Sequence, residues 1–298
     1  MHIEYFNYFY QVAKVKSISK VAKQIHISQS ALSQQIQKFE NSVGYQLFKR
    51  SNKGVELTEM GEIVLQYSEN ILNTYKKMMT DLEKGSNISN TVAIQACHSI
   101  SHYALPCSIY KIKEKFPYHQ YELSTSSSDK IRSSVENNIC DIGFVYGKGN
   151  EENLEYYEVG RNKFVLTSSF YYETPKEISV EDLKNYPIIS MSYDNQITTA
   201  FEENLNEHDV DYDDLNIIFT LDSIEAIKSS LNRKHGLALL PYISIKEELY
   251  KKTYKVIQVK DFEISIKVYM VTRKESKNSK AVVEFANLFK KIGKDSFC

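Results

Sequence analysis

The chain has 298 residues, of which 42% are hydrophobic and 25% charged, with only 10 Gly and 5 Pro. This length suits a small domain joined to a larger one, and the composition excludes long disordered or low-complexity regions. No apolar run approaches the roughly 18 residues of a membrane span. The first residues also lack the pattern of a signal peptide, so we expect a cytoplasmic protein with no membrane partner.

The net charge of −1 is unevenly distributed along the chain. The first 60 residues carry eight Lys and Arg against four Glu, a net charge of +4, which leaves −5 for the remainder. A basic head on an acidic body is typical of a DNA-binding domain fused to a second domain. A solvated basic surface is the simpler alternative.

The first 45 residues have the pattern of three helices. Apolar residues at spacings of three and four predict a first helix from Ile3 to about Ala13. A second is expected over 19–25, and Ser28 is a good N-cap for a third. Because the intervening segment has room only for a tight turn, the sequence predicts a helix-turn-helix.

The polar side of the third helix carries short hydroxyl and amide side chains. Such groups can hydrogen-bond to base edges, and base contacts concentrate at the N-terminal end of a recognition helix. An ordinary solvated helix face is the alternative, but such a face would usually carry more Lys and Glu. We therefore predict that five residues contact DNA bases: Gln29, Ser30, Ser33, Gln34 and Gln37.

Residues 47–58 predict a small hairpin, or wing, because apolar and polar residues alternate there and 52–54 supply a turn. Cations on a wing lie beside DNA phosphates, and its tip can enter the minor groove. The predicted DNA-binding residues of the wing are Lys49, Arg50 and Lys53. The DNA-binding domain is expected to cover residues 1–58.

A long helix should follow, from the N-cap Thr58 to about Lys84. Its apolar residues form a narrow stripe close to a heptad seam. That stripe consists of Val64, Tyr67, Ile71, Tyr75, Met78 and Leu82. A small domain cannot cover so long a helix, so residues 59–90 are expected to form a linker and dimerisation segment that pairs with a second copy.

Residues 91–298 alternate between strand and helix patterns, which predicts an α/β domain with a parallel, doubly wound sheet. Strands are expected at 91–96, 121–124, 141–146, 164–167, 188–190, 217–221, 236–241 and 264–271. Helices are expected at 106–116, 130–137 and 199–206, and another from Ser223.

Three segments rich in Ser and Thr follow predicted strands, at 97–102, 126–129 and 192–198. Open parallel sheets bind ligands beyond the carboxyl ends of their strands, where helix N-termini suit an anion. The alternative is that these hydroxyls only cap helices. The candidate ligand-binding residues in these segments are Ser99, Ile100, Ser101, Ser127, Ser128 and Thr198. His98 and His102 flank the site and either pair with an anion or are ordinary polar histidines.

The sequence contains no nucleophile elbow, P-loop, dinucleotide fingerprint or HExxH motif, so we expect neither an enzyme nor a cofactor. A stand-alone ligand-binding protein would leave the first 60 residues unexplained. The four cysteines are irregularly spaced. Cys97 and Cys140 are predicted to be small buried hydrophobes. A redox or metal-sensing role for Cys97, Cys107 or Cys140 would require their sulfurs to converge in space.

The N-terminal pattern closely resembles that of LysR-type transcriptional regulators over some forty positions without gaps. The matching residues are Val21-Ala22, Ile25, Ile27-Ser28-Gln29-Ser30-Ala31-Leu32-Ser33, Gln35-Ile36, Phe39-Glu40, Gly44, Leu47-Phe48, Arg50, Val55, Leu57-Thr58 and Gly61. Two positions depart from the common pattern. Phe39 stands where the family more often has Leu, and Gln34 where it often has Arg, which bears on the base that is read.

The resemblance implies a winged helix-turn-helix, a linker helix in an antiparallel dimer coiled coil, and dimers that pair into tetramers. It implies that Gln29, Ser30, Ser33, Gln34 and Lys53 approach bases and that Arg50 approaches the backbone. It also implies a two-lobed effector domain like a periplasmic binding protein, with lobe I about 91–160 and 265–298 and lobe II about 161–264.

By the same resemblance, Ser99, Ser101 and Ser128 match positions where relatives touch effectors, and Thr198 is a looser match. The chain is thereby identified as a member of a family of regulators that bind operator DNA and respond to a small molecule between the lobes. RNA polymerase is an expected further partner. The effector itself is not specified by the sequence.

Overall fold

The computed structural model describes residues 2–51, 54–83, 90–192, 194–274 and 279–293. The chain divides into two compact units, Met1–Asn87 and Ile88–Cys298, which we call the N-terminal and C-terminal units and describe separately.

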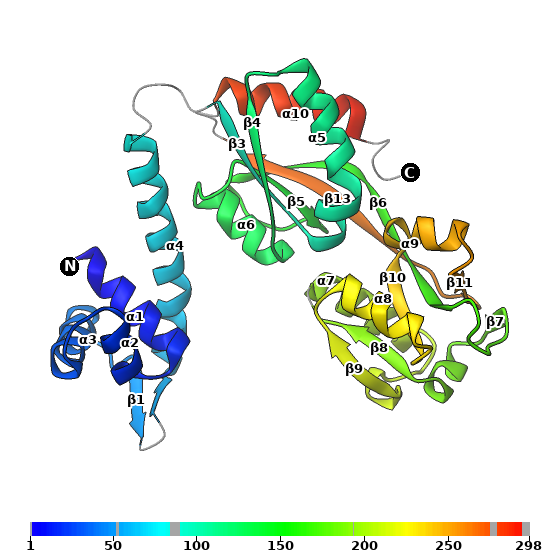
Figure 1. Cartoon of the computed structure of the whole chain (residues 1–298), viewed down its shortest axis with the longest axis horizontal. Helices are drawn as coiled ribbons and strands as arrows, with labels where there is room; N and C mark the ends of the chain where they lie inside the picture. The colour runs from blue at the N-terminus through cyan, green and yellow to red at the C-terminus, as the bar shows by residue number, and fades with distance from the viewer. Residues whose placement is uncertain (1, 52–53, 84–89, 193, 275–278, 294–298) are drawn as a thin grey trace. The chain divides into compact units, whose positions relative to one another are not determined.

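The N-terminal unit consists of helices and one hairpin (Figure 1). In order these are α1 (Ile3–Val15), α2 (Ile18–Gln24), α3 (Gln29–Val43), β1 (Phe48–Ser51), β2 (Gly54–Leu57) and α4 (Glu59–Glu83). The expected caps are present. The Ser28 hydroxyl accepts from the backbone N–H of Ala31 at 3.1 Å, and the Thr58 hydroxyl accepts from Gly61 N–H at 3.0 Å. The helix-turn-helix and its wing therefore form as the local pattern predicts.

Three fully buried aromatic rings join α1, α3 and β1 in the core of this unit. Phe9 lies with its ring centroid 5.6 Å from Phe39 and 5.1 Å from Phe48. The Glu40 carboxylate, at the end of α3, accepts from the backbone N–H groups of Leu47 and Phe48 at 2.7 and 3.1 Å. These bonds fix the start of the wing against α3, so the two elements expected to contact DNA are held together.

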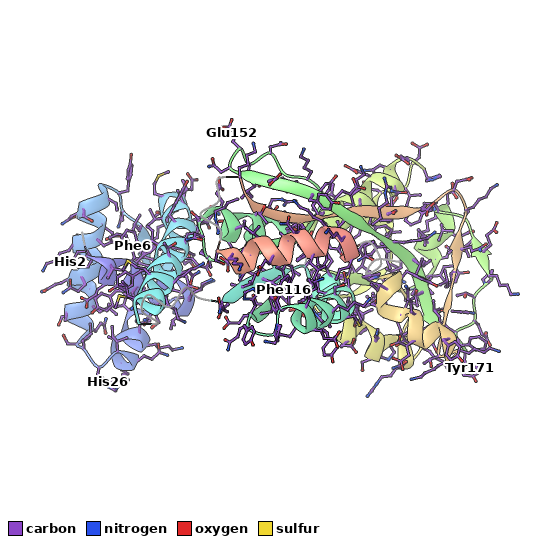
Figure 2. The ribbon with its side chains drawn as sticks, turned by 90° about the horizontal axis from the view of Figure 1, so that it is seen from above. His2, Phe6, His26, Phe116, Glu152 and Tyr171 are labelled. Atoms are coloured by element: carbon purple, nitrogen blue, oxygen red, sulfur yellow. The ribbon has the colours of Figure 1, made fainter. Side chains whose placement is uncertain are left out.

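The outer edge of the N-terminal unit is formed by the turn between α2 and α3. His26 in that turn is exposed, whereas Phe6 of α1 points inward and is only 8% exposed (Figure 2). His26 also has a φ of 59°, a left-handed conformation that lets the chain reverse within the short turn. The N-terminal end of α3 is therefore presented at the surface.

The C-terminal unit is built on one nine-stranded sheet, in the order β4-β3-β5-β13-β6-β10-β8-β9 with β11 paired to β6. Its strands are β3 (Thr91–Ala96), β4 (Gln120–Thr125), β5 (Ile142–Tyr146), β6 (Leu154–Ser169), β8 (Ile188–Met191), β9 (Ile217–Leu221), β10 (Leu237–Pro241), β11 (Tyr254–Val256) and β13 (Ile264–Arg273). Two short strands, β7 (Glu177–Ile178) and β12 (Gln258–Val259), pair apart from it.

The predicted parallel pairing holds within each lobe, but the sheet as a whole is mixed. β3 is parallel to β4 and β5, and β8 is parallel to β9 and β10, but β6 and β13 are antiparallel to their neighbours. The sequence predicted only residues 164–167 of β6, which in fact spans 16 residues. The sheet is mixed because β6 carries the chain from the first lobe to the second and β13 carries it back. These two strands pair with each other in the antiparallel sense along ten positions.

The first lobe contains β3, β4 and β5 with α5 (Leu105–Lys115), α6 (Ser128–Glu136) and α10 (Lys280–Ile292) (Figure 1). The second contains β8 to β11 with α7 (Asn195–Asn206), α8 (Ile224–Asn232) and α9 (Tyr242–Tyr250). A π-helical turn, η1 (Ile100–Ala104), precedes α5. Helices α9 and α10 were not predicted. Because η1, α6, α7 and α8 each follow a parallel strand, their N-terminal ends lie at the carboxyl ends of the strands.

Candidate functional site

The outward side of α3 carries the polar residues expected to contact DNA. Gln29, Ser30, Gln34 and Gln37 are exposed and Ser33 is half-buried; we call these five the recognition face. The opposite side packs into the core through residues that are 0% exposed, namely Leu32, Ile36 and Phe39. Within the described residues, the amides of the recognition face make no hydrogen bond to another protein group. Their donors and acceptors are available to base edges.

The wing carries the cations that the sequence assigned to DNA phosphates. Lys49 lies in β1 with its side chain exposed. Arg50 is in the same strand, paired with Val55, but its side chain is not among those described. Lys53 lies outside the described residues.

In the C-terminal unit, the first predicted segment contributes Ser99 to a buried cluster of polar side chains. The Asn162 amide donates to the Tyr146 hydroxyl at 2.7 Å and to the Ser99 hydroxyl at 3.0 Å. Ser99 and Tyr146 also hydrogen-bond to each other. Burial raises the pKa of Tyr146. The cluster therefore ties the strand ends of β3 and β5 to β6 with neutral groups.

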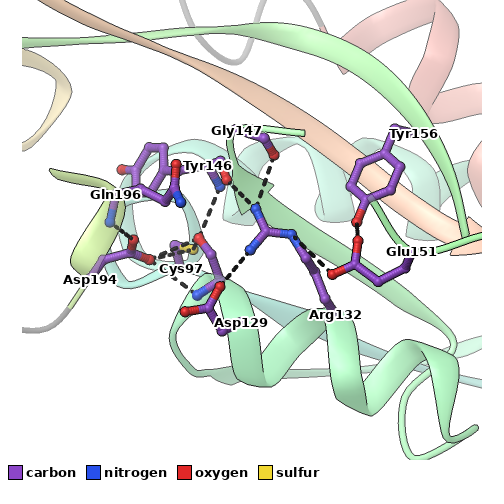
Figure 3. Close-up of polar contacts among 10 residues, drawn as sticks. Cys97, Asp129, Arg132, Tyr146, Gly147, Glu151, Tyr156, Asp194 and Gln196 are labelled. Atoms are coloured by element: carbon purple, nitrogen blue, oxygen red, sulfur yellow. Dashed lines mark hydrogen bonds and ion pairs between the residues drawn. The ribbon is translucent and has the colours of Figure 1, made fainter. Parts of the chain in front are cut away.

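The second and third segments meet at a carboxylate (Figure 3). Asp194, the N-cap of α7 in the second lobe, reaches the N-terminus of α6 in the first. Its Oδ2 accepts from the Ser128 hydroxyl at 2.8 Å, the Ser128 backbone N–H at 3.1 Å and the Cys97 thiol at 3.3 Å. We call these three donors the carboxylate seat. Asp194 is 4% exposed.

The Cys97 thiol belongs to this seat and is not merely a small hydrophobe. It lies 3.1 Å from the Ser128 hydroxyl. Burial, with Asp194 beside it, raises the pKa of the Cys97 thiol well above its usual range. Because the thiolate is the reactive species, this thiol is poorly suited to redox sensing. Cys140 is also buried and Cys107 exposed, and the described residues hold no cluster of three His, Cys, Asp or Glu that could bind a metal.

Arg132 of α6 holds the loop after β5 in place. Its guanidinium donates to the carbonyl oxygens of Tyr146 at 2.6 Å and Gly147 at 3.2 Å, and to Asp129 at 2.8 Å (Figure 3). It also lies 4.0 Å from Glu151. These contacts direct the charge of Arg132 toward the end of β5 and its neighbouring carboxylates.

The remaining expected effector residues are placed unequally. Ser101 is buried and accepts from the Thr125 hydroxyl at 3.1 Å. The Ile100 side chain is in the core, and Ser127 is the half-buried N-cap of α6. Thr198 lines a pocket of about 20 Å³ in the second lobe, between β8 and α7. A second cavity, about 340 Å³, follows β6 and β12 and is lined by none of the expected residues.

The two histidines stack on each other beside the second lobe. The rings of His98 and His102 are 4.2 Å apart, and burial followed by His102 lowers the pKa of His98. The next residue, Tyr103, donates to Glu225 of α8 at 2.6 Å. Glu225 also lies 3.6 Å from Lys228. The lobes are thus joined by a second polar contact, distinct from Asp194.

The sequence did not single out four residues that organise this region: Tyr146, Asn162, Arg132 and Asp194. Asp194 lies inside the predicted segment 192–198, and an Asp before a helix pattern is an N-cap signal. Nothing in the sequence shows that the same carboxylate also crosses to Ser128, because that contact joins residues 66 positions apart.

Comparison with known proteins covers both units. The family model described as "LysR substrate binding domain" matches residues 85–293, and that described as "Bacterial regulatory helix-turn-helix protein, lysR family" matches residues 3–62. A protein named "Probable RuBisCO transcriptional regulator" from Phaeodactylum tricornutum is 29% identical over 289 residues, 94% of each chain.

Solved structures share the fold. CbnR, a LysR family transcriptional regulator, has a TM-score of 0.69 at 14% identity over 100% of both chains. DarR from Vibrio fischeri, solved in complex with DNA, has a TM-score of 0.54 at 20% identity over 99% of both chains. None of the helices among the described residues has the length and apolar character needed to cross a membrane.

Proposed function

The chain belongs to the LysR family of transcriptional regulators, and from this premise we propose how its residues divide the work of DNA binding and effector sensing. It is a DNA-binding regulator with a helix-turn-helix and an effector-binding domain, and not an enzyme. The observation that carries the proposal is the exposed recognition face on α3, whose amides make no hydrogen bond within the described residues.

We assign base reading to the recognition face: Gln29, Ser30, Ser33, Gln34 and Gln37. A Gln amide can pair bidentately with adenine, and a serine hydroxyl can donate or accept. Lys49, Arg50 and Lys53 of the wing would contact phosphates, which adds affinity but no sequence information. The bonds from Glu40 that fix the wing against α3 support this division, because both elements must reach one duplex together.

Self-association is assigned to α4. Several of its apolar side chains are exposed although the helix packs on α1. Tyr67 is 64% exposed and Leu82 is 67% exposed, and Ile71, Tyr75 and Met78 are also exposed. A second copy of the chain would cover this stripe as an antiparallel dimer, with dimers pairing into tetramers.

The effector is placed where the lobes of the C-terminal unit meet. Its proposed contacts are Ser99, Ser101, Ser127, Ser128 and Thr198, with Ile100 contributing only its backbone because its side chain is fully buried. Effector binding would shift the arrangement of the dimer through different affinities for two states. Contact with RNA polymerase in the cytoplasm would transmit the change to transcription.

The proposed function is tested by binding of the purified full-length chain to DNA from upstream of its own gene. The control is shuffled DNA of equal length and composition, at the same salt concentration. We expect a preference of about 10³-fold or more, the lower end of specific recognition. Equal affinity for the two DNAs would contradict sequence-specific regulation.

A further inference from the structure

The carboxylate seat has the chemistry of an anion site. Two of its donors come from one residue, the backbone N–H and hydroxyl of Ser128, and the third is the Cys97 thiol. The backbone N–H belongs to the first residue of α6, a nine-residue helix, whose N-terminal partial positive charge favours an anion. All three donors converge on one oxygen, Oδ2 of Asp194.

The Asp194 carboxylate is held by hydrogen bonds. Within the described residues, neither Lys nor Arg forms an ion pair with Asp194, and the nearby Arg132 is directed to Asp129 and Glu151. Burying an ionised carboxylate is costly unless hydrogen bonds and local dipoles compensate. Since Asp194 is 4% exposed, the seat and the N-terminus of α6 supply that compensation, as they would for any carboxylate placed there.

Groups of the chain itself already make hydrogen bonds to the polar atoms where the two lobes meet. Oδ2 of Asp194 accepts from the three donors of the seat, and Oδ1 accepts from Gln196 N–H at 3.0 Å. The Ser99 hydroxyl is likewise engaged, with Tyr146 and Asn162. A ligand can therefore accept hydrogen bonds from the seat only if it displaces the group that already accepts them.

We propose that Asp194 is an internal competitor for the effector: its carboxylate occupies the seat and fastens the second lobe to the first, and a carboxylate-bearing effector binds by replacing it. The inference rests on the proposed effector-sensing function and adds the chemical class of the ligand. It also gives the ligand a means of action. Because Asp194 caps α7, its release frees the N-terminus of α7 from the first lobe and favours a different arrangement of the lobes.

The test removes the Asp194 carboxylate from the seat by substitution and supplies formate as a free carboxylate in its place. Asp194→Ser keeps a good N-cap for α7 but is too short to span the lobes. The full-length variant is melted in sodium formate and in sodium chloride of equal ionic strength. Formate at about ten times its dissociation constant should raise the melting temperature of the variant by about 3–6 °C. The wild type, whose seat is taken, should show no formate-specific shift.

Cys97 reports the state of the seat independently. Its thiol is fully buried under Asp194 and Ser128, so alkylation located by peptide mass spectrometry should be slow in the wild type. The alkylation of Cys97 should be at least about tenfold faster in Asp194→Ser, because local opening exposes the thiol more often in this variant. Formate should make the alkylation of Cys97 slow again. Ser128→Ala removes a donor of the seat; its Cys97 should also become reactive, but formate should not protect it.

Tyr103→Phe is the matched control for a general loosening of the lobes, because it removes a different hydrogen bond between them. It should give no formate-specific shift. The proposal is overturned if formate does nothing to Asp194→Ser, or if it stabilises Tyr103→Phe or the wild type equally. If Asp194→Ser does not fold, Asp194→Gly is used, because glycine is also tolerated at an N-cap and cannot reach the seat, and a formate-specific shift is still required. Operator binding by the wild type is measured separately, so its absence would refute the regulator and not the seat.

Discussion

The two units present serines and amides in opposite states. On α3, the polar side chains of the recognition face are mostly exposed, and their amides make no hydrogen bond within the described residues. Where the two lobes of the C-terminal unit meet, Ser99 and Ser128 are at most 1% exposed and are hydrogen-bonded to other parts of the chain. Similar residue types therefore form an exposed surface that can bind a partner in one unit and a buried, hydrogen-bonded site in the other.

This contrast indicates where each unit is sensitive to change. An exposed polar residue contributes little to folding, so its loss affects binding. A buried polar residue whose partner is removed leaves an unsatisfied group, so its loss affects stability first. Substitutions in each unit should therefore separate a loss of binding from a loss of stability.

Ser33→Trp should abolish specific DNA binding. Ser33 is half-buried in the middle of the recognition face, and a bulky ring there would hold α3 away from the floor of the major groove. We expect a loss of about 10³-fold or more, down to non-specific affinity, measured by fluorescence anisotropy on the operator. Asn41→Trp, exposed near the C-terminal end of α3, is the control. If Ser33→Trp binds normally, α3 is not the recognition helix.

The first of the two units was the easier to predict, because its signals are local. Ser28 lies three residues from the N–H that it caps, and the apolar spacing of α3 is visible within its own 15 residues. The recognition face follows from that register alone. The wing was predictable for the same reason, since its turn residues and its alternation lie side by side in the sequence.

The junction of the two lobes was harder to predict, because its contacts join distant parts of the chain. The positions of Ser99 and Ser128 at strand ends were predicted, but their partners Asn162 and Asp194 lie 63 and 66 residues away. The first half of β6 was missed because charged residues and Gly160 interrupt its pattern, while the strand is held by pairing with β13. Sequence periodicity located the hydroxyls but could not show that the chain itself satisfies them.

Tyr146→Phe should have the second largest effect, and on stability only. It removes the hydroxyl that accepts from Asn162 and contacts Ser99, and it leaves those buried groups short of a partner. We expect unfolding of the C-terminal unit to become easier by about 1–3 kcal/mol, measured by urea titration. Tyr250→Phe, at an 88% exposed position, should change nothing. If Tyr146→Phe leaves the free energy of unfolding unchanged, the Tyr146 hydroxyl does not satisfy the buried polar groups around it.

Lys49→Gln should weaken DNA binding only a few-fold, and equally for operator and random DNA. One lost phosphate contact lowers the slope of log affinity against log salt concentration by about 0.9. The measurement is a salt titration of both DNAs. Lys115→Gln, on α5 of the other unit, should keep the slope. If Lys49→Gln instead lost affinity for the operator alone, Lys49 would contact bases and not only phosphates.

His98→Gln should produce the smallest effect, a change in how stability depends on pH. Burial, and then the neighbouring His102, lower the pKa of His98 below 6.5, with Glu225 and Asp222 opposing them. The unfolded chain then binds more protons than the folded one, so this histidine's contribution is present above 6.5 and is lost as the pH falls toward the lowered pKa. In His98→Gln, the free energy of unfolding measured by urea titration should depend less on pH across that window. A steeper loss of stability on acidification in His98→Gln would mean that protonated His98 stabilises the fold.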